Sequence, residues 1–255
     1  MATYKKRGHK PKNQAEAQEM LQQESTTAEV FSALDSSASR TEKWVARNQN
    51  YILGVIGVIA VAVLGYLGYQ QFIQQPREES ASNELFYPLQ YFRQAQADET
   101  AADSLYTLAL EGAEGKYGLL DIVDEYSGTH AANLATYAAG VSYLKLSQYD
   151  QAIEYLEDYQ SDDAVLGAVS LGSIGDAFMQ LGQSDEALAY YEKAVKHDAN
   201  DFTTPLYLQK AGLTALETQQ FEKAEGYFTR IRDDYPQSTQ ANGVEALIGM
   251  ARKGS

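Results

Sequence analysis

The hydrophobic pattern divides this chain into one unbroken apolar stretch and a long region of amphipathic helices. Between residues 52 and 69 no side chain is more polar than tyrosine, and no charge lies between Arg47 and Arg77. As a helix, residues 52–73 would extend about 33 Å, enough for the roughly 30 Å hydrocarbon core of a bilayer. Backbone groups find no water there, so a spanning segment must be helical. The pattern predicts one transmembrane helix over residues 51–75.

Two other interpretations of this stretch fit less well. A buried core helix of a soluble domain is usually shorter. A cleaved signal peptide has a short basic region before its apolar run, whereas about fifty residues precede the run here. We therefore expect a retained anchor, with Tyr51, Tyr66 and Tyr69 at the membrane interfaces.

Small residues line one side of the predicted span. At about 100° per residue its glycines fall within a sector roughly 80° wide, with a valine in the middle. Such a face lets another helix approach closely in lipid, but glycine is also common in membrane spans generally. The sequence leaves two explanations open: a face that packs against another helix, or the general frequency of glycine in membrane spans. The residues are Gly54, Gly57, Val61, Gly65 and Gly68.

Charge predicts the direction of the span. Residues 4–12 carry five Lys or Arg and no acid. Residues 1–74 have net charge +2, whereas residues 75–255 hold 12 basic and 29 acidic residues, net −17. The positive-inside rule places residues 1–50 in the cytoplasm and residues 76–255 outside it. An outer domain this acidic argues against nucleic acid as a partner, because nucleic-acid binding needs a basic surface.

The tail, residues 1–50, is polar and charged, and we expect it to be disordered. Two capping-box patterns, at residues 26–29 and 39–42, leave short helices open as an alternative. On the outer side, Pro76 is expected to end or kink the spanning helix. Amphipathic runs then predict helices near residues 80–97, 101–112 and 116–126.

An internal repeat dominates the outer region. Three segments share small and large positions at the spacing of a tetratricopeptide repeat, and their equivalent alanines are 35 and 37 residues apart. Small residues let paired helices approach, and aromatic rings fill the gaps between neighbouring pairs. A decayed unit is expected before them, and a capping helix over residues 242–253 after them. The repeat positions are Gly140, Tyr143, Leu146, Ala152 and Leu156; Gly175, Phe178, Leu181, Ala187, Tyr191 and Ala194; and Gly212, Ala224, Phe228 and Pro236.

The first helices of these repeats should line a groove. It is predicted to be largely apolar and to suit apolar segments of partner proteins. A terminal helix of the same chain is the alternative occupant. The Lys/Asn/Arg set that would clamp a peptide carboxylate is missing. The predicted groove residues are Leu134, Tyr137, Val141, Leu144, Val169, Asp176, Met179, Leu206, Gln209 and Leu213.

Catalytic chemistry is scarcely represented in the sequence. The chain has no cysteine, and His9, His130 and His197 are far apart, so neither a metal-binding motif nor a nucleophile motif is present. Paired carboxylates such as Asp162 and Asp163 lie at helix ends, where capping and solvation account for them. We expect no enzyme activity and no cofactor.

Residues 40–250 resemble the YfgM-like family of ancillary Sec translocon subunits. The likeness is carried by residues 104–135 and by the repeat positions Gly175, Ala187 and Ala194, and the tail is similar to members from the Bacteroidota. The resemblance implies a single-pass protein of the bacterial inner membrane with its outer domain in the periplasm. It also implies association with Sec channel subunits, with a membrane-anchored prolyl-isomerase-like chaperone and with secreted clients.

The sequence thus predicts an all-α protein, one N-terminal transmembrane helix followed by a tetratricopeptide-repeat solenoid over residues 76–255. Its expected function is a non-enzymatic scaffold at the Sec translocon. An envelope scaffold for cell-wall or outer-membrane assembly, independent of secretion, is the alternative. A eukaryotic organelle receptor would need the opposite topology.

Overall fold

The computed structural model describes residues 44–254, and within this range every regular element is helical. The two capping-box segments of the tail lie outside the described residues. The described residues divide into two units, one that ends at Tyr69 and one that begins at Gln70. The division into cytoplasmic tail, span and periplasmic domain, with boundaries at 50 and 75, stays a prediction.

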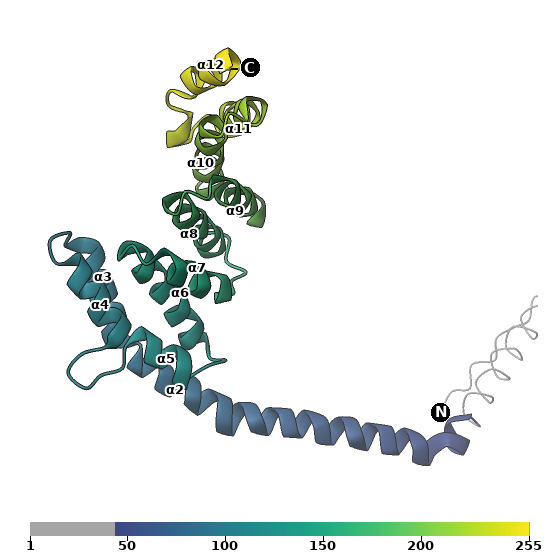
Figure 1. Ribbon diagram of the computed structural model, residues 1–255. Coiled ribbons are helices and arrows are strands. Elements are labelled where there is room, and N and C mark those ends of the chain that lie inside the picture. The colour runs from purple at the N-terminus through teal and green to yellow at the C-terminus, as the bar shows by residue number, and fades with distance from the viewer. Residues whose placement is uncertain (1–43, 255) are drawn as a thin grey trace, which may run out of the picture. The chain divides into compact units, whose positions relative to one another are not determined.

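Residues 44–69 form one uninterrupted helix, which we call the apolar helix (Figure 1, purple to blue). It belongs to the helical stretch Trp44–Ala97, the one helix among residues 44–254 that is long and apolar enough to cross a membrane. Its large side chains lie open: Tyr51, Val58 and Leu64 are all exposed.

The second unit begins with a π-helical turn, η1 (Gln70–Gln74), followed by α2 (Gln75–Glu84). The chain stays helical across Pro76, so of the two expected outcomes the end of the helix is not observed, whereas the π turn directly before Pro76 is an irregularity typical of a kink. Proline cannot donate the backbone hydrogen bond of a helix interior, and its ring clashes with the preceding turn of a regular α-helix. The wider π turn immediately before it accommodates the ring.

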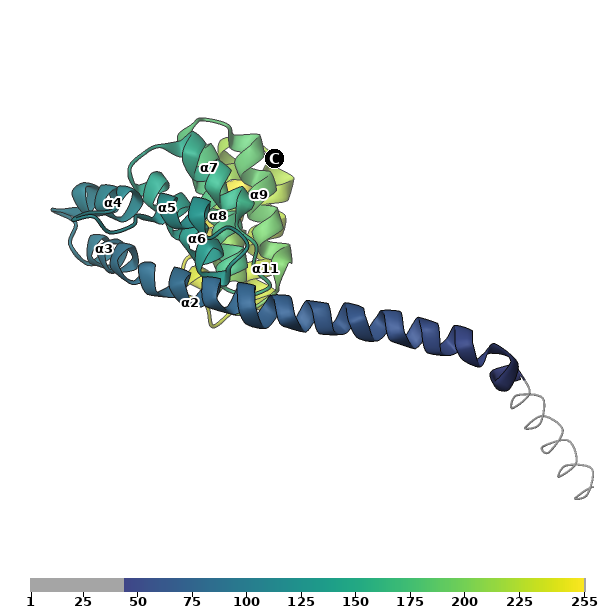
Figure 2. The same ribbon diagram turned by 90° about the horizontal axis from the view of Figure 1, so that it is seen from below.

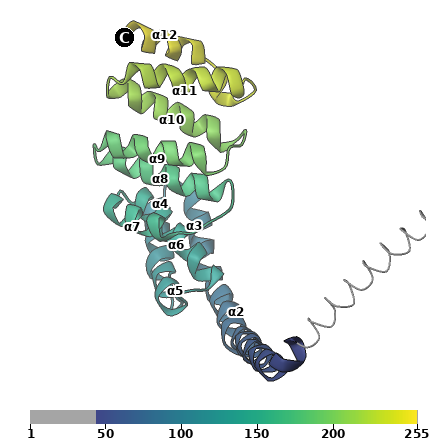
Figure 3. The same ribbon diagram turned by 90° about the vertical axis from the view of Figure 1, so that its right-hand side faces the viewer.

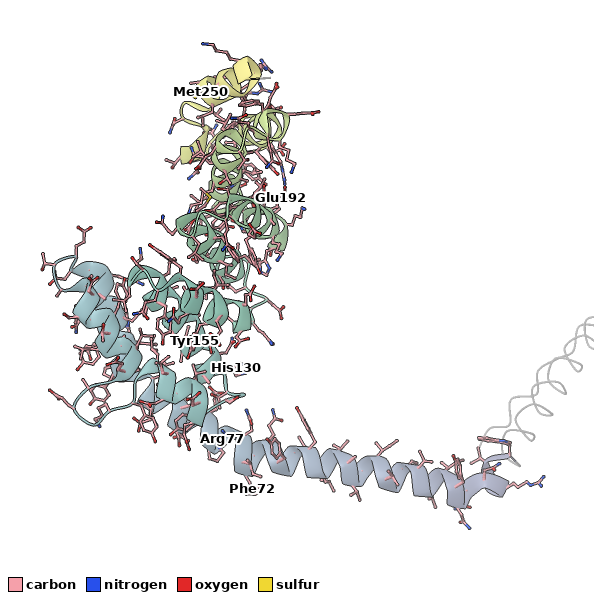
Figure 4. All side chains as sticks on the ribbon, in the orientation of Figure 1. Phe72, Arg77, His130, Tyr155, Glu192 and Met250 are labelled. Atoms are coloured by element: carbon pink, nitrogen blue, oxygen red, sulfur yellow. The ribbon has the colours of Figure 1, made fainter. Side chains whose placement is uncertain are left out.

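A stem, residues 74–78, binds the turn between α5 (Leu119–Glu125) and α6 (His130–Lys145). The Glu78 carboxylate accepts hydrogen bonds from the backbone N–H groups of His130 (2.7 Å) and Ala131 (3.0 Å), so it caps the start of α6. Arg77 donates to the Glu125 carbonyl and Gln74 to the Gly128 carbonyl. Figure 4 labels Arg77 and His130 at this junction. The stem is therefore an integral part of the repeat unit.

The first core of this unit is built by α2, α3 (Phe86–Ala97), α4 (Ala102–Glu111), α5 and α6. Leu85 separates α2 from α3 inside the helical stretch that runs to Ala97; its backbone stays helical, with φ −64° and ψ −18°. The sequence predicted one helix over 80–97. Phe92 and Tyr106 pack edge to face, with ring centroids 5.9 Å apart. Seen from below, α3 and α4 lie beside α5 and α6, away from α9 and α11 (Figure 2).

The repeats follow as antiparallel helix pairs stacked in chain order (Figure 3). Repeat 1 pairs α6 with α7 (Tyr149–Asp158), and repeat 2 pairs α8 (Leu166–Gln180) with α9 (Ser184–His197). Repeat 3 pairs α10 (Thr203–Glu217) with α11 (Phe221–Asp234). A 3-10 turn, η2 (Thr239–Ala241), leads to α12 (Val244–Gly254), which packs on α11 as the predicted final helix.

In each repeat the two helices pack closely where a glycine of the first helix faces a large side chain of the second helix. A Cβ added at Gly140 would lie 2.6 Å from Leu156, at Gly175 2.6 Å from the Tyr191 ring, and at Gly212 2.5 Å from the Phe228 ring. The spacing between glycine and partner is the same in all three repeats. These side chains thus fill space inside one pair, not only between pairs as predicted. Between repeats, Tyr207 packs over Gly172.

The turn inside each repeat is also the same. Ser147, Gly182 and Gln219 have positive φ (59°, 74° and 59°), and the next N–H bonds to the carbonyl five residues back. This is the Schellman arrangement that ends a helix on a left-handed residue. Only the second repeat uses glycine there.

Candidate protein-binding groove

The first helices of the three repeats, α6, α8 and α10, carry all ten predicted groove residues. We call their shared surface the groove. Leu134 and Leu213 are exposed, and the other eight are half-buried, so every predicted side chain keeps accessible surface. Whether this surface binds a partner stays a prediction.

The structure brings three predicted residues together. Leu144, Asp176 and Met179 line a pocket of about 530 Å³ between the first helices. The remaining predicted residues do not contribute to it. Its polar lining was not predicted from the sequence: Lys145, Tyr149, Gln180, Tyr191 and Lys210 complete the wall.

Asp176 is the centre of a polar cluster in this pocket. Lys210 Nζ lies 2.6 Å from each carboxylate oxygen, and the Tyr191 hydroxyl donates to Oδ1 at 2.7 Å. The rings of Tyr191 and Tyr207 stack with centroids 6.3 Å apart, and the ammonium lies within 5.8 Å of both. The groove is therefore less apolar than predicted, although charge at its centre is balanced.

The electrostatics of this cluster indicate a structural role for its tyrosines and not a catalytic one. Burial raises the pKa of Tyr191 and of Tyr207, and the negative charge of Asp176 raises both further. The tyrosines therefore stay neutral hydrogen-bond donors at physiological pH. The pairing of Asp176 with Lys210 could have been found from the sequence, because the two lie one repeat length apart on successive first helices.

The second helices are tied by glutamates across successive repeats. The Tyr190 hydroxyl donates to Glu157, the Tyr227 hydroxyl to Glu192, and Arg252 Nε to Glu225 at 2.7 Å. Burial, together with the Glu157 bond, raises the pKa of Tyr190 to about 12. Figure 4 shows Glu192 on the outer side of α9. These contacts join the second helices of successive repeats to one another and to α12.

Two further hollows lie outside the groove. One, of about 390 Å³, is lined by α7, α8 and α9 and includes Lys193 and His197. The other, of about 540 Å³, lies at the start of α6 and includes Asn133, whose side chain exchanges two hydrogen bonds with the Gln160 backbone.

Nothing in the described residues points to catalysis. Between residues 44 and 254 no group of three or more His, Asp or Glu side chains could hold a metal ion. The His197 ring lies 3.2 Å from the Asp163 carbonyl and packs over Gly167. Asp163 accepts from the N–H groups of Val165 and Leu166, so its role is capping, as predicted. His9 lies outside the described residues.

On the apolar helix, the predicted packing face is open. A Cβ added at Gly54, Gly57, Gly65 or Gly68 would meet no atom within 4 Å, and Val61 is exposed. A docking role for this face stays a prediction.

Comparison with known proteins agrees with the repeat architecture. Models of the tetratricopeptide repeat match residues 168–201, and residues 135–163 and 207–238. The uncharacterized protein ycf37 of Guillardia theta is 32% identical over 117 residues. The match covers 44% of this chain and 64% of that protein, so the chain spans less than two thirds of its relative. Three tetratricopeptide repeats in series imply protein partners.

Proposed function

We propose that this protein is a membrane-anchored scaffold of the bacterial secretion machinery. In this proposal the apolar helix crosses the inner membrane, the repeats lie in the periplasm, and the protein associates with Sec channel subunits. The observation that carries it is the combination of an apolar helix, whose large side chains lie open, with a groove whose predicted side chains stay accessible.

The two surfaces have different tasks in this scheme. The apolar helix, with its stripe of small residues, would pack against a helix of the channel. The groove would hold an apolar segment of a client emerging from the channel, or of a prolyl-isomerase-like chaperone that takes the client over. Because the stem caps α6 through Glu78, the first repeat is held close to residue 70, where the second unit begins.

Topology is tested by protease protection on sealed inner-membrane vesicles of known orientation. We expect the repeats to resist protease when the periplasmic side faces inward, and to be degraded once the vesicles are opened. The positive-inside charge distribution supports this orientation. Degradation in sealed vesicles would overturn it and favour a receptor with its repeats in the cytosol.

Association is tested by purifying the tagged full chain in mild detergent. Recovery of Sec channel subunits, identified by mass spectrometry after crosslinking from the apolar helix, is the expected result. Recovery of cell-wall or outer-membrane assembly enzymes without the channel would overturn the secretion role and favour the envelope scaffold.

A further inference from the structure

The edge of the groove where α8 and α10 begin carries five exposed carboxylates. They belong to the end of α7, the end of α9 and the loops that follow these helices. None of them forms an ion pair within residues 44–254. We call this set the acidic rim. Its members are Asp158, Asp162, Asp163, Asp198 and Asp201.

Two positions in the acidic rim oppose the electrostatics of the helices that carry them. Asp158 is the last residue of α7, and Asp198 is the C-cap of α9. The C-terminal end of a helix carries partial negative charge, so a carboxylate there is unfavourable. Asp163 differs, because its carboxylate caps the start of α8. The helices that carry Asp158 and Asp198 therefore do not stabilise these carboxylates, although Asp158 also lines the hollow at the start of α6.

Apolar side chains stand in the same loops. Phe202, just before α10, is 71% exposed, and Val165 and Leu166, at the start of α8, are exposed as well. At the same level of the groove lie Val169 and Leu206, both half-buried. The His197 ring at the end of α9 lies 3.2 Å from the Asp163 carbonyl before α8, so the loops that precede α8 and α10 are neighbours. We call the apolar residues of these loops and of the adjoining first helix turns the apolar band. A single exposed apolar side chain is ordinary, but a band of them along a groove marks a binding surface.

We infer that this edge of the groove binds a segment of a partner protein in which Lys or Arg side chains flank leucine, isoleucine or phenylalanine. The inference rests on the proposed groove and specifies its partner. Apolar side chains of the segment cover the band, while its cations lie over Asp158, Asp198 and the neighbouring loop carboxylates. Charge that is unfavourable in the free protein becomes favourable in the complex.

The energetics determine how such binding behaves. The carboxylates are exposed, so their attraction is screened by salt and contributes to the association rate and to selectivity. The apolar band supplies affinity that salt does not weaken. A segment with apolar residues flanked by glutamate would meet the same band but be repelled by the acidic rim.

The test measures binding of synthetic peptides of about twelve residues to the full chain in detergent, by fluorescence anisotropy. One peptide alternates leucine and phenylalanine with lysine, a second carries glutamate instead of lysine, and a third combines lysine with glycine and serine. At about 0.05 M salt we expect the first to bind at least about tenfold more tightly than either other peptide, and the ratio to the second to shrink at about 0.5 M.

Variants assign the effect to the acidic rim. The fourfold variant Asp158→Asn, Asp162→Asn, Asp198→Asn, Asp201→Asn should lose about tenfold in affinity for the lysine peptide. Its melting midpoint should stay unchanged or rise, because two unfavourable helix-end charges are removed. Phe202→Ser should weaken both apolar peptides equally. The matched control neutralises four exposed acids of the second helices, Asp150→Asn, Glu154→Gln, Glu186→Gln and Glu222→Gln, and should keep wild-type affinity.

The outcomes separate this inference from the function on which it rests. Equal affinity for the lysine and glutamate peptides overturns the basic partner and leaves an apolar groove in place. Equal affinity for the lysine peptides with and without apolar residues reduces the acidic rim to non-specific attraction and also overturns it. Failure of every apolar peptide to bind overturns the groove itself, and with it this part of the proposed function.

Discussion

The glycines of the repeats and those of the apolar helix have opposite surroundings. At Gly140, Gly175 and Gly212 an added Cβ would overlap a side chain of the paired helix at 2.5–2.6 Å. At Gly57 and Gly65 the same Cβ would meet nothing within 4 Å. One residue type therefore does two jobs: in the repeats it completes contacts inside the fold, and in the apolar helix it leaves a smooth surface open.

This difference shows what a small-residue pattern can reveal. In the repeats, each glycine is followed at a constant spacing by the large side chain that needs it, so the sequence contains both halves of the contact. In the apolar helix the glycines are present, but no large side chain packs on them. No described residue of the same unit covers that surface, so lipid or another helix must cover it.

The largest expected effect comes from filling a repeat glycine. Gly212→Ala should lower the free energy of unfolding by about 2–3 kcal/mol, because the buried Phe228 ring must move from a well-packed site. Chemical denaturation of the full chain in detergent, followed by circular dichroism, measures it.

A matched control lies in the second helix of the same repeat. Gly226, in α11, has no atom within 4 Å of an added Cβ, so Gly226→Ala should instead raise stability by up to about 1 kcal/mol through helix propensity. The same sign for both substitutions would show that packing does not distinguish the two glycines.

Removing the stem cap should have the next largest effect. Glu78→Ala leaves the N–H groups of His130 and Ala131 without their carboxylate, which typically costs about 1–2 kcal/mol. The neighbouring exposed Glu79→Ala is the control. Hydrogen exchange should quicken at the start of α6 in the first variant alone; unchanged exchange there would mean that the stem is not coupled to repeat 1.

Alkaline pH should reveal how much the buried hydroxyl of Tyr191, whose ring packs on Gly175, contributes to stability. Folding raises the pKa of Tyr191 above its ordinary value of 10.0, so its contribution to stability is complete below pH 10 and is lost as pH rises beyond it. At pH 11 the loss is up to about 1.4 kcal/mol. Tyr191→Phe should therefore lose less stability than the wild type between pH 8 and 11. Parallel losses would place Tyr191 in an environment like that of an exposed tyrosine.

A smaller gain is expected where a repeat turn lacks glycine. Ser147 has positive φ, where a side chain is disfavoured, so Ser147→Gly should stabilise repeat 1 by at most about 1 kcal/mol. The reverse change, Gly182→Ser, should cost repeat 2 a similar amount. Thermal unfolding of both variants measures it, and a loss of stability in Ser147→Gly would contradict the strain at this turn.

The smallest effect on folding is expected in the apolar helix. Replacing Gly57 and Gly65 with leucine should leave the unfolding of the repeats unchanged, because a Cβ at either position meets no atom within 4 Å. Crosslinking to the partner helix should nevertheless be lost if this face docks. Unchanged co-purification would refute the docking role, and a destabilised repeat unit would break the contrast between the two sets of glycines.

Much of the fold could be predicted because its repeats contain both partners of each contact. Gly175 with Tyr191 and the equivalent alanines predicted the helix pairs, and the apolar run predicted the long helix. The separation of α2 from α3 at Leu85 and the π turn before Pro76 could not be predicted, because the residue types at both places are equally compatible with a regular α-helix. Glu78 gave no local signal either, since the backbone groups that it caps lie 52 and 53 residues away.

The groove was predicted only in outline. Its first-helix positions follow from the repeat spacing, and all ten keep accessible surface. The polar cluster around Asp176 was not predicted, because it pairs Asp176 with Lys210 of the next repeat, and the predicted groove residues do not include Lys210. The acidic rim was not predicted as one surface, because its members belong to two loops that only the packing of α8 against α9 brings together.

The buried apolar side chains of the second unit form two separate clusters, and this division has a mechanical consequence. One cluster consists of buried side chains of α2 to α6, and the other of buried side chains of α8 to α12. Ala152 and Leu156 of α7 are also buried, but they belong to neither cluster. Adjacent repeats support each other only through their shared interfaces. Force applied to the C-terminal repeats should therefore separate the unit at α7, while the part that holds the stem stays folded. Such a junction would yield under load and reform when the load is released.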